Sequence, residues 1–221
     1  MHCLYKEIFE SGLGALELRV NSNSAFVVVE TGAFSTVLLT VGHRVTILRT
    51  PVSEAHLPTS RSISYAKAWL FYIQKRNSVP EQLTFSMRIA ELGSNVETSP
   101  NTGEWLTAIE FANDFHQLHI GTEDEDSYAW EAGSAWIPKR LGKALKEGLI
   151  ITTIEEDGLT TQIPELMATE QFYFHYIVAE SPRRKSLDYP NEWDIATWEA
   201  VRQQRKVLEE SWRQQTKEPP L

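Results

Sequence analysis

Residues 14–50 read GALELRVNSNSAFVVVETGAFSTVLLTVGHRVTILRT, and this stretch decides the fold. Leu16, Leu18 and Val20 alternate with charged residues, which is the period of a half-buried strand. Three further apolar runs follow, separated by turn-forming residues at 21–24, 31–32 and 42–43. Parallel pairing needs long crossover connections, so these short connections predict a β-rich block of antiparallel hairpins.

After this block the sequence predicts a helix over about residues 60–76. Apolar side chains recur from Ile63 to Ile73 at helical spacing, and Ser60 could cap the first turn. A strand is the alternative, because alternate residues of the same segment are also apolar. We favour the helix, since Lys67 would interrupt the apolar face of such a strand.

Residues 83–178 are predicted to be mostly β structure. The segment LTFSMRI at 83–89 alternates apolar and polar residues, and Asp157-Gly158 between two β-branched runs indicates a hairpin. Residues 93–103 are interpreted as a polar loop. Within the same region, Pro138 and Gly148 are typical of the two ends of a short helix.

The C-terminal region is predicted to be a linker over 181–190 and an amphipathic helix over about 191–216. The helix carries an apolar stripe interrupted by Arg205, and we expect it to pack on its own domain; the stripe comprises Trp198, Val201, Leu208 and Trp212. The chain is therefore expected to form a single α+β domain over residues 1–217. Its sheet is mainly antiparallel and bent, with two or three helices packed on it.

The composition is that of a folded, acidic protein. Of the 221 residues 42% are apolar and 10% aromatic, which is enough for one large core. Lys and Arg number 21 against 30 Asp and Glu, and the resulting net charge of -9 disfavours binding along a phosphate backbone. Cys3 is the only cysteine, and no apolar run approaches the roughly 20 residues of a membrane-spanning helix. We therefore expect a cytoplasmic protein with no secretory signal, membrane contact or nucleic-acid partner.

The clearest functional signal is the acidic run Glu123-Asp124-Glu125-Asp126. Four adjacent carboxylates repel one another and stay hydrated, so the run is expected at the surface. Trp130, Glu131 and Trp136 follow closely, and aromatic side chains beside charges are typical of a partner-binding surface. These seven residues are the candidate partner-binding site. A plain solvated loop and a calcium loop are the alternatives, although the ligand order of an EF-hand is absent.

No catalytic or metal-binding motif is present in the sequence. His116 and His119 precede the acidic run, but side chains three residues apart on a strand point to opposite faces, so we expect no shared metal ion. His175 lies in an apolar run and is interpreted as a hydrogen-bonded core residue. The short helix before the Asp157-Gly158 hairpin is similar to a DNA-binding winged helix. The tip of that hairpin is acidic, however, which argues against phosphate contacts.

These observations favour a protein-binding module without a cofactor. The acidic charge predicts a basic protein partner, which an inhibitor or an immunity-type protein would shield. An enzyme, most simply a hydrolase that uses dispersed His and acidic residues, is the first alternative. A structural subunit of a larger complex, docked through the terminal helix, is the second.

Overall fold

The computed structural model describes residues 1–51, 63–185 and 196–215, and in the last segment the side chains of residues 197–208. Within these residues, strands form two antiparallel sheets. The first sheet has the order β1-β2-β7-β12-β11, with bounds His2–Ser11, Gly14–Ser22, Leu83–Ile89, Gly158–Gln162 and Thr152–Glu155. The second has the order β3-β4-β5-β6-β13-β10-β9-β8, with bounds Val27–Thr31, Ser35–Thr40, His43–Pro51, Tyr65–Lys75, Gln171–Pro182, His116–Glu123, Leu106–Ala112 and Glu97–Gly103.

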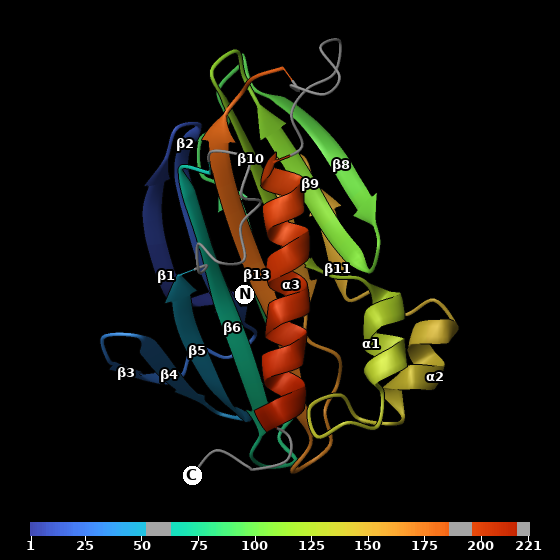
Figure 1. The fold of residues 1–221 in the computed structure, drawn as a ribbon. Coiled ribbons are helices and arrows are strands. Elements are labelled where there is room, and N and C mark those ends of the chain that lie inside the picture. Colours follow the sequence, from blue (N-terminus) through green and yellow to red (C-terminus); the bar gives the residue numbers. More distant parts are fainter. Residues whose placement is uncertain (52–62, 186–195, 216–221) are drawn as a thin grey trace.

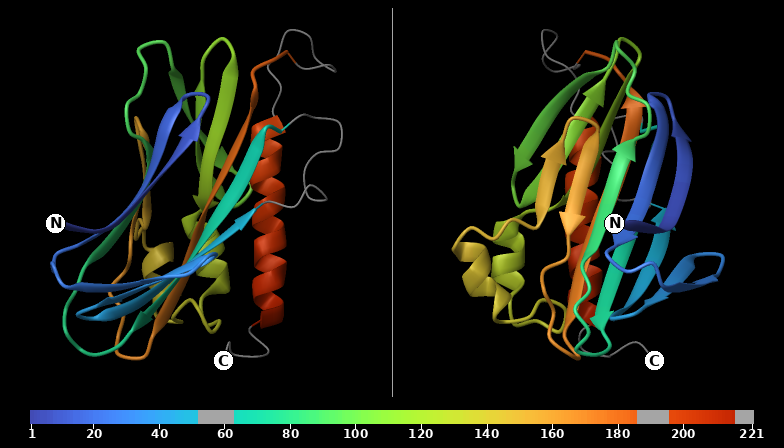
Figure 2. Two further views of the ribbon diagram at one scale, coloured as in Figure 1. Left: turned by 90° about the vertical axis from the view of Figure 1, so that its left-hand side faces the viewer. Right: turned by 180° about the vertical axis from the view of Figure 1, so that it is seen from behind.

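Three helices accompany the sheets in the described residues: α1 (Glu125–Glu131), α2 (Leu141–Lys146) and α3 (Ala196–Gln215). The short helices α1 and α2 pack against each other beside the sheets, and α3 covers the outer face of the eight-stranded sheet (Figures 1 and 2). The predicted α+β class with a mainly antiparallel sheet and a C-terminal helix is therefore confirmed. No helix in the described ranges is both long and apolar enough to cross a membrane.

The two sheets face each other across an aromatic core. Phe71 of β6 and Phe85 of β7 belong to different sheets, and their ring centroids are 5.1 Å apart. Phe174 of β13 stacks on Phe71 at 4.5 Å. Tyr176 joins this cluster, and its hydroxyl donates to Thr161 Oγ1 of the opposite sheet at 2.8 Å. The apolar core is continuous from both sheets to α3, because buried side chains of all three belong to one cluster.

The predicted helix over residues 60–76 is wrong: residues 65–75 form strand β6, which pairs with β5 and β13. Residues 60–62 lie outside the described part of the chain. Lys67, which argued against a strand, does lie on the same strand face as Trp69. Its ammonium sits 4.5 Å above the Trp69 ring and 3.7 Å from a Glu7 carboxylate oxygen. An amphipathic lysine can therefore continue an aromatic strand face without breaking it.

Other boundaries also differ from the prediction. The interpreted loop at 93–103 contains the edge strand β8, and β1 adds a strand before the β-rich block at 14–50. The predicted linker at 181–190 begins too early, because Ser181 and Pro182 still belong to β13. The remainder of that linker and the helix start near 191 lie largely outside the described residues. The short helix before Gly148 and the Asp157-Gly158 hairpin are confirmed.

The terminal helix α3 packs on its own sheet, over β10 and β13. Val201, Leu208 and Arg205 of the predicted stripe are buried, and Trp198 is partly buried. The side chain of Trp212 is outside the described set. The helix approaches the sheet closely at Gly121 of β10, where a Cβ would lie 2.5 Å from Val201 Cγ1.

Candidate functional site

The acidic run lies at the junction between β10 and α1. Asp124 is the N-cap of α1, with an extended backbone, and it accepts a hydrogen bond from Ser127 N at 2.8 Å. Glu125 and Asp126 occupy the first helical turn, where the helix dipole stabilises negative charge. The carboxylates are therefore tolerated together because a helix N-terminus receives them.

The two carboxylates at the start of α1, Glu125 and Asp124, both have structural contacts. Oε1 of Glu125 accepts hydrogen bonds from Ile151 N at 2.9 Å and Thr152 N at 3.1 Å, which fixes the start of β11. Burial raises the pKa of Asp124, the hydrogen bond from Ser127 N lowers it, and the neighbouring carboxylates Asp126 and Glu125 raise it further, so the pKa lies above its ordinary value.

Glu123 contradicts the prediction that the whole run is exposed. It is the last residue of β10 and only 4% exposed. Alternation along β10 places Gln117, His119, Gly121 and Glu123 on one face. That face is the one covered by α3, because Val201 meets Gly121 and Thr197 meets His119. Glu123 is buried because the acidic run begins within β10, on the strand face that α3 covers.

Glu123 belongs to a buried polar layer between the sheet and α3. One of its carboxylate oxygens lies 3.8 Å from His175 Nδ1, and His175 also contacts the Tyr173 hydroxyl at 3.2 Å. Burial lowers the pKa of His175 to about 3, with a smaller contribution from Arg205. Burial alone lowers the pKa of His119 to about 3. Both imidazoles are therefore neutral at pH 7, and the prediction that His175 is a hydrogen-bonded core residue is confirmed.

The exposed part of the predicted site lies on α1. Asp126 is exposed, and Trp130, four residues later on the same helical face, is 75% exposed. Glu131 is half-buried at the end of α1. Trp136 lies apart from this face, since its ring packs on Tyr72 of β6 with centroids 5.0 Å apart. The structure thus separates the seven predicted residues into interior, capping and exposed groups.

A second exposed tryptophan, which the sequence analysis did not identify, faces Trp130. Trp105 lies in the two-residue turn between β8 and β9, and its ring centroid is 6.4 Å from that of Trp130, with the ring planes at 66°. The Trp105 carbonyl accepts from Asp124 N at 3.3 Å, which joins the hairpin tip to the start of α1. Because 93–103 was interpreted as a loop, the hairpin that presents Trp105 was missed.

The backbone of this turn is strained. Glu104 has φ 51° and Trp105 has φ 70°, and a two-residue turn with both φ values positive is of type I′. Asn-Gly is the preferred sequence there, because a Cβ is disfavoured in the left-handed region. Glu104 also forms an ion pair with Arg202 of α3 at 2.6 Å. We call Glu104, Trp105, Asp126 and Trp130 the Trp–carboxylate patch.

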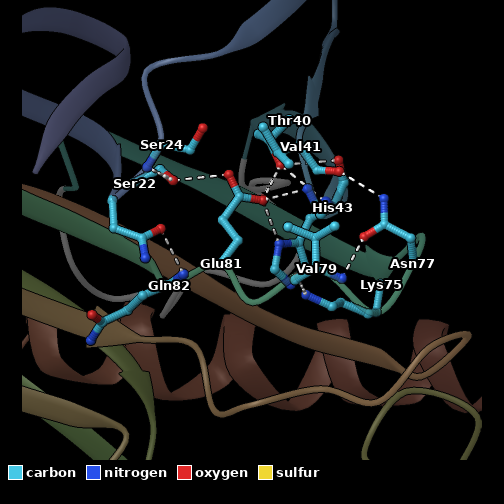
Figure 3. Close-up of polar contacts among 12 residues, drawn as sticks. Ser22, Ser24, Thr40, Val41, His43, Lys75, Asn77, Val79, Glu81 and Gln82 are labelled. Carbon is cyan, nitrogen blue, oxygen red and sulfur yellow. Dashed lines mark hydrogen bonds and ion pairs between the residues drawn. The ribbon is translucent and has the colours of Figure 1, made fainter.

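A separate polar centre lies around Glu81, in the connection between β6 and β7 (Figure 3). Its carboxylate accepts four hydrogen bonds of 2.5–2.9 Å, from Ser22 Oγ, Thr40 Oγ1, Gly42 N and His43 Nδ1. Burial raises the Glu81 pKa, but the hydrogen bonds outweigh it, and the pKa lies below its ordinary value. Burial has the opposite effect on the neighbouring imidazole and lowers the pKa of His43.

This centre binds loops together and has the character of a structural clamp. Glu81 connects the end of β2 to the β4–β5 turn, and Lys75 Nζ donates to Val79 O at 2.5 Å within the same loop (Figure 3). Glu81 and Lys75 also line a cleft of about 510 Å³ between the β6–β7 and β12–β13 connections. The nearby hydroxyls of Ser22 and Thr40 bond the carboxylate and not the imidazole, so they are not arranged as nucleophiles.

No cluster of three or more His, Cys, Asp or Glu side chains in the described ranges could hold a metal ion. His116 and His119 point to opposite faces of β10. His116 Nδ1 lies 3.1 Å from a Glu180 oxygen, and His119 Nδ1 lies 2.8 Å from Thr197 Oγ1. In comparisons with known proteins, no family model and no curated protein matches the chain.

Proposed function

We propose that the chain is a protein-binding module whose contact surface is the Trp–carboxylate patch. The observation that carries this proposal is the pair of exposed tryptophans, Trp105 and Trp130, presented by two different elements with their rings in an edge-to-face arrangement. Tryptophan is enriched among the residues that dominate binding energy at protein interfaces. Two such rings at adjoining tips form an anchor for a partner side chain.

Backbone strain at Trp105 supports a functional role for the patch. A left-handed conformation costs a residue with a Cβ roughly 1–2 kcal/mol, and the turn holds two such residues in succession. Stability alone would favour Asn-Gly at these positions. Strain that brings no evident stability is typical of functional sites.

The partner is proposed to be basic. Asp126 lies one helical turn from Trp130, Glu104 is adjacent to Trp105 in the turn, and the chain has a net charge of -9. A Lys or Arg side chain can contact the face of a tryptophan by a cation–π interaction while its charge approaches a carboxylate. A module that covers such a basic site would act as an inhibitor or an immunity-type protein in an intracellular setting.

The test is affinity purification of tagged full-length chain from its native cells, with quantitative mass spectrometry of what is retained. Trp130→Ala and Asp126→Asn are compared with the wild type and with Phe115→Ala, which removes an equally exposed aromatic ring at the β9–β10 turn. We expect a basic protein to be depleted at least about tenfold by both patch variants and retained by Phe115→Ala. Equal recovery in all four samples would contradict the proposal.

The alternatives receive less support. A hydrolase would have its base at His43, yet the neighbouring hydroxyls are bonded to Glu81. A structural subunit docked through the apolar stripe of α3 would need that stripe to be free, whereas Ala200, Val201 and Leu208 pack on the chain's own sheet.

A further inference from the structure

We propose that strand β3 pairs edge to edge with β3 of a second copy of this chain, which makes the protein a dimer through a surface independent of the Trp–carboxylate patch. β3 is a terminal strand of the eight-stranded sheet, so among the residues that the structure describes one row of its backbone N–H and C=O groups has no neighbouring strand. These groups select another β-strand as their partner.

The other sheet edges in the described residues carry features that discourage such pairing. β8 contains Pro100, which lacks a backbone N–H, and β11 has only four residues. β1 has a register shift between Cys3 and Tyr5 and carries Lys6 on the strand. In contrast, β3 has the sequence Val-Val-Val-Glu-Thr, with no proline, lysine or register shift.

Exposed apolar side chains are concentrated on the hairpin that β3 forms with β4. Val28 and Val29 are 45% and 43% exposed, and Phe26 and Phe34 at its two ends are 57% and 74% exposed. The hairpin projects away from α3, at the far side of the sheet (Figure 1). Val28 and Val29 point to opposite faces of β3, so both faces of this edge strand carry exposed apolar side chains. Exposed apolar side chains beside an unpaired strand edge mark a contact site.

Charge favours an antiparallel register centred on Val29 over one centred on Glu30. In this register Val29 faces Val29 of the partner copy and Val28 faces Glu30, so the two Glu30 carboxylates do not oppose each other. A register centred on Glu30 would place them face to face.

The same register accounts for the exposed aromatics. Phe26 of one copy would lie opposite Gly32 of the other, where no side chain occupies the space, and near Phe34 in the same turn. Both rings would thereby lose water contact in the dimer. A second copy would thus pair the backbone edge of β3 and cover the exposed valine and phenylalanine side chains of the hairpin.

The association is tested by sedimentation of the full-length chain from about 1 µM to about 1 mM, the range of weak protein contacts. We expect a dimer whose dissociation constant rises at least about tenfold in Val29→Lys, since an inward lysine blocks an edge. Ile150→Lys, which adds the same charge at another exposed apolar residue, should leave it unchanged. A monomer throughout, or equal loss in both variants, would overturn the proposal.

The register is tested by cysteine substitution in a Cys3→Ser background, which removes the exposed native thiol. Val29→Cys should form a disulfide-linked dimer on oxidation, because facing residues bring their Cβ atoms within about 5 Å. Val28→Cys, which faces Glu30, should cross-link far less. Equal cross-linking of both would refute the register. Dimerisation should also strengthen with salt, because two chains of charge -9 repel each other.

Discussion

Val201 Cγ1 of α3 lies 2.5 Å from the position that a Cβ on Gly121 of β10 would occupy. The helix and the sheet therefore meet at a residue that has no side chain. Leu106 Cδ1 and Ala108 Cβ of the next strand complete the same contact, at 3.2 and 3.5 Å from that position. This close approach brings α3 down onto the polar layer that contains His119, His175 and Glu123.

Replacing Gly121 should therefore destabilise the protein. Gly121→Ala adds a methyl group with no space and is expected to cost about 1–3 kcal/mol of unfolding free energy in urea denaturation. Val201→Ala removes the clashing methyl group, so the double variant should lose less stability than the sum of the two single variants. Strict additivity would mean that the helix does not rest on this glycine.

Stability should fall as the pH is lowered below about 6.5, because of the buried histidines. The folded state holds the pKa of His119 and His175 near 3, whereas the unfolded chain binds protons at its ordinary histidine pKa. The stabilisation is complete above pH 6.5 and is lost between about 6.5 and 3, which amounts to about 2 kcal/mol for each histidine at pH 5.

Urea denaturation at pH 7, 6 and 5 measures this loss. Glu123 and Arg205 face His175 from β10 and α3, and Thr197 faces His119 from α3. His175→Gln should flatten the pH dependence of stability relative to the wild type. An unchanged slope in His175→Gln would show that another group titrates.

The clamp residue Glu81 should contribute strongly to stability. Glu81→Gln leaves the shape intact but turns an amide donor toward groups that donate, and it is expected to cost roughly 2–4 kcal/mol. Glu165→Gln, at an exposed carboxylate of the same cleft, should change stability by less than about 0.5 kcal/mol. Because its pKa is lowered, the Glu81 contribution is present above the ordinary carboxyl pKa and is lost as pH falls through the folded value. Thermal unfolding of both variants at pH 7 tests the difference.

The strand predictions from sequence were accurate for segments in which apolar and polar residues alternate clearly or β-branched residues form a run. LTFSMRI became β7, and the runs of residues 14–50 became β2 to β5. The prediction for residues 65–75 failed because β6 is buried on both faces in its middle, from Ala68 to Phe71. Its apolar residues therefore fit both the helical period and the strand period. Lys67 was misleading, because it lies on the apolar strand face that it was expected to interrupt.

The candidate site was only partly predictable for a related reason. Trp130 and Asp126 lie at the surface as expected, but the run of carboxylates crosses from a strand into a helix cap, which local charge counting does not show. Glu123 is therefore buried and Asp124 is a cap. Trp105 was missed because its turn uses Glu-Trp where Asn-Gly would signal a hairpin.

Within the acidic run, stability and binding should depend on different carboxylates. Glu125→Ala removes the acceptor for Ile151 N and Thr152 N and is expected to cost about 1–3 kcal/mol. Asp126→Ala should cost no more than about 0.5–1 kcal/mol from the helix dipole. In binding assays, Asp126→Ala should slow association and reduce its salt dependence. A large loss of stability in Asp126→Ala would show that Asp126 stabilises the fold and would contradict its assignment to binding alone.

The turn at Glu104 and Trp105 offers the sharpest separation of fold from function. Asn-Gly accepts positive φ without strain, so the double variant Glu104→Asn, Trp105→Gly should gain about 1 kcal/mol or more, even though it loses the exposed ion pair to Arg202. The same variant removes one of the two rings and should weaken partner binding at least about tenfold. Thermal unfolding and binding are measured on the same preparation.

Two single substitutions resolve the contributions. Trp105→Ala removes the ring but keeps a Cβ at φ 70°, so it should lose binding without the gain in stability. Glu104→Asn keeps the ring and relieves part of the strain, so it should gain stability and retain most binding. If the Asn-Gly variant binds as well as the wild type, Trp105 is not part of the contact surface. If it binds poorly but is no more stable, the ring still contributes to binding and the strain argument for a functional turn fails.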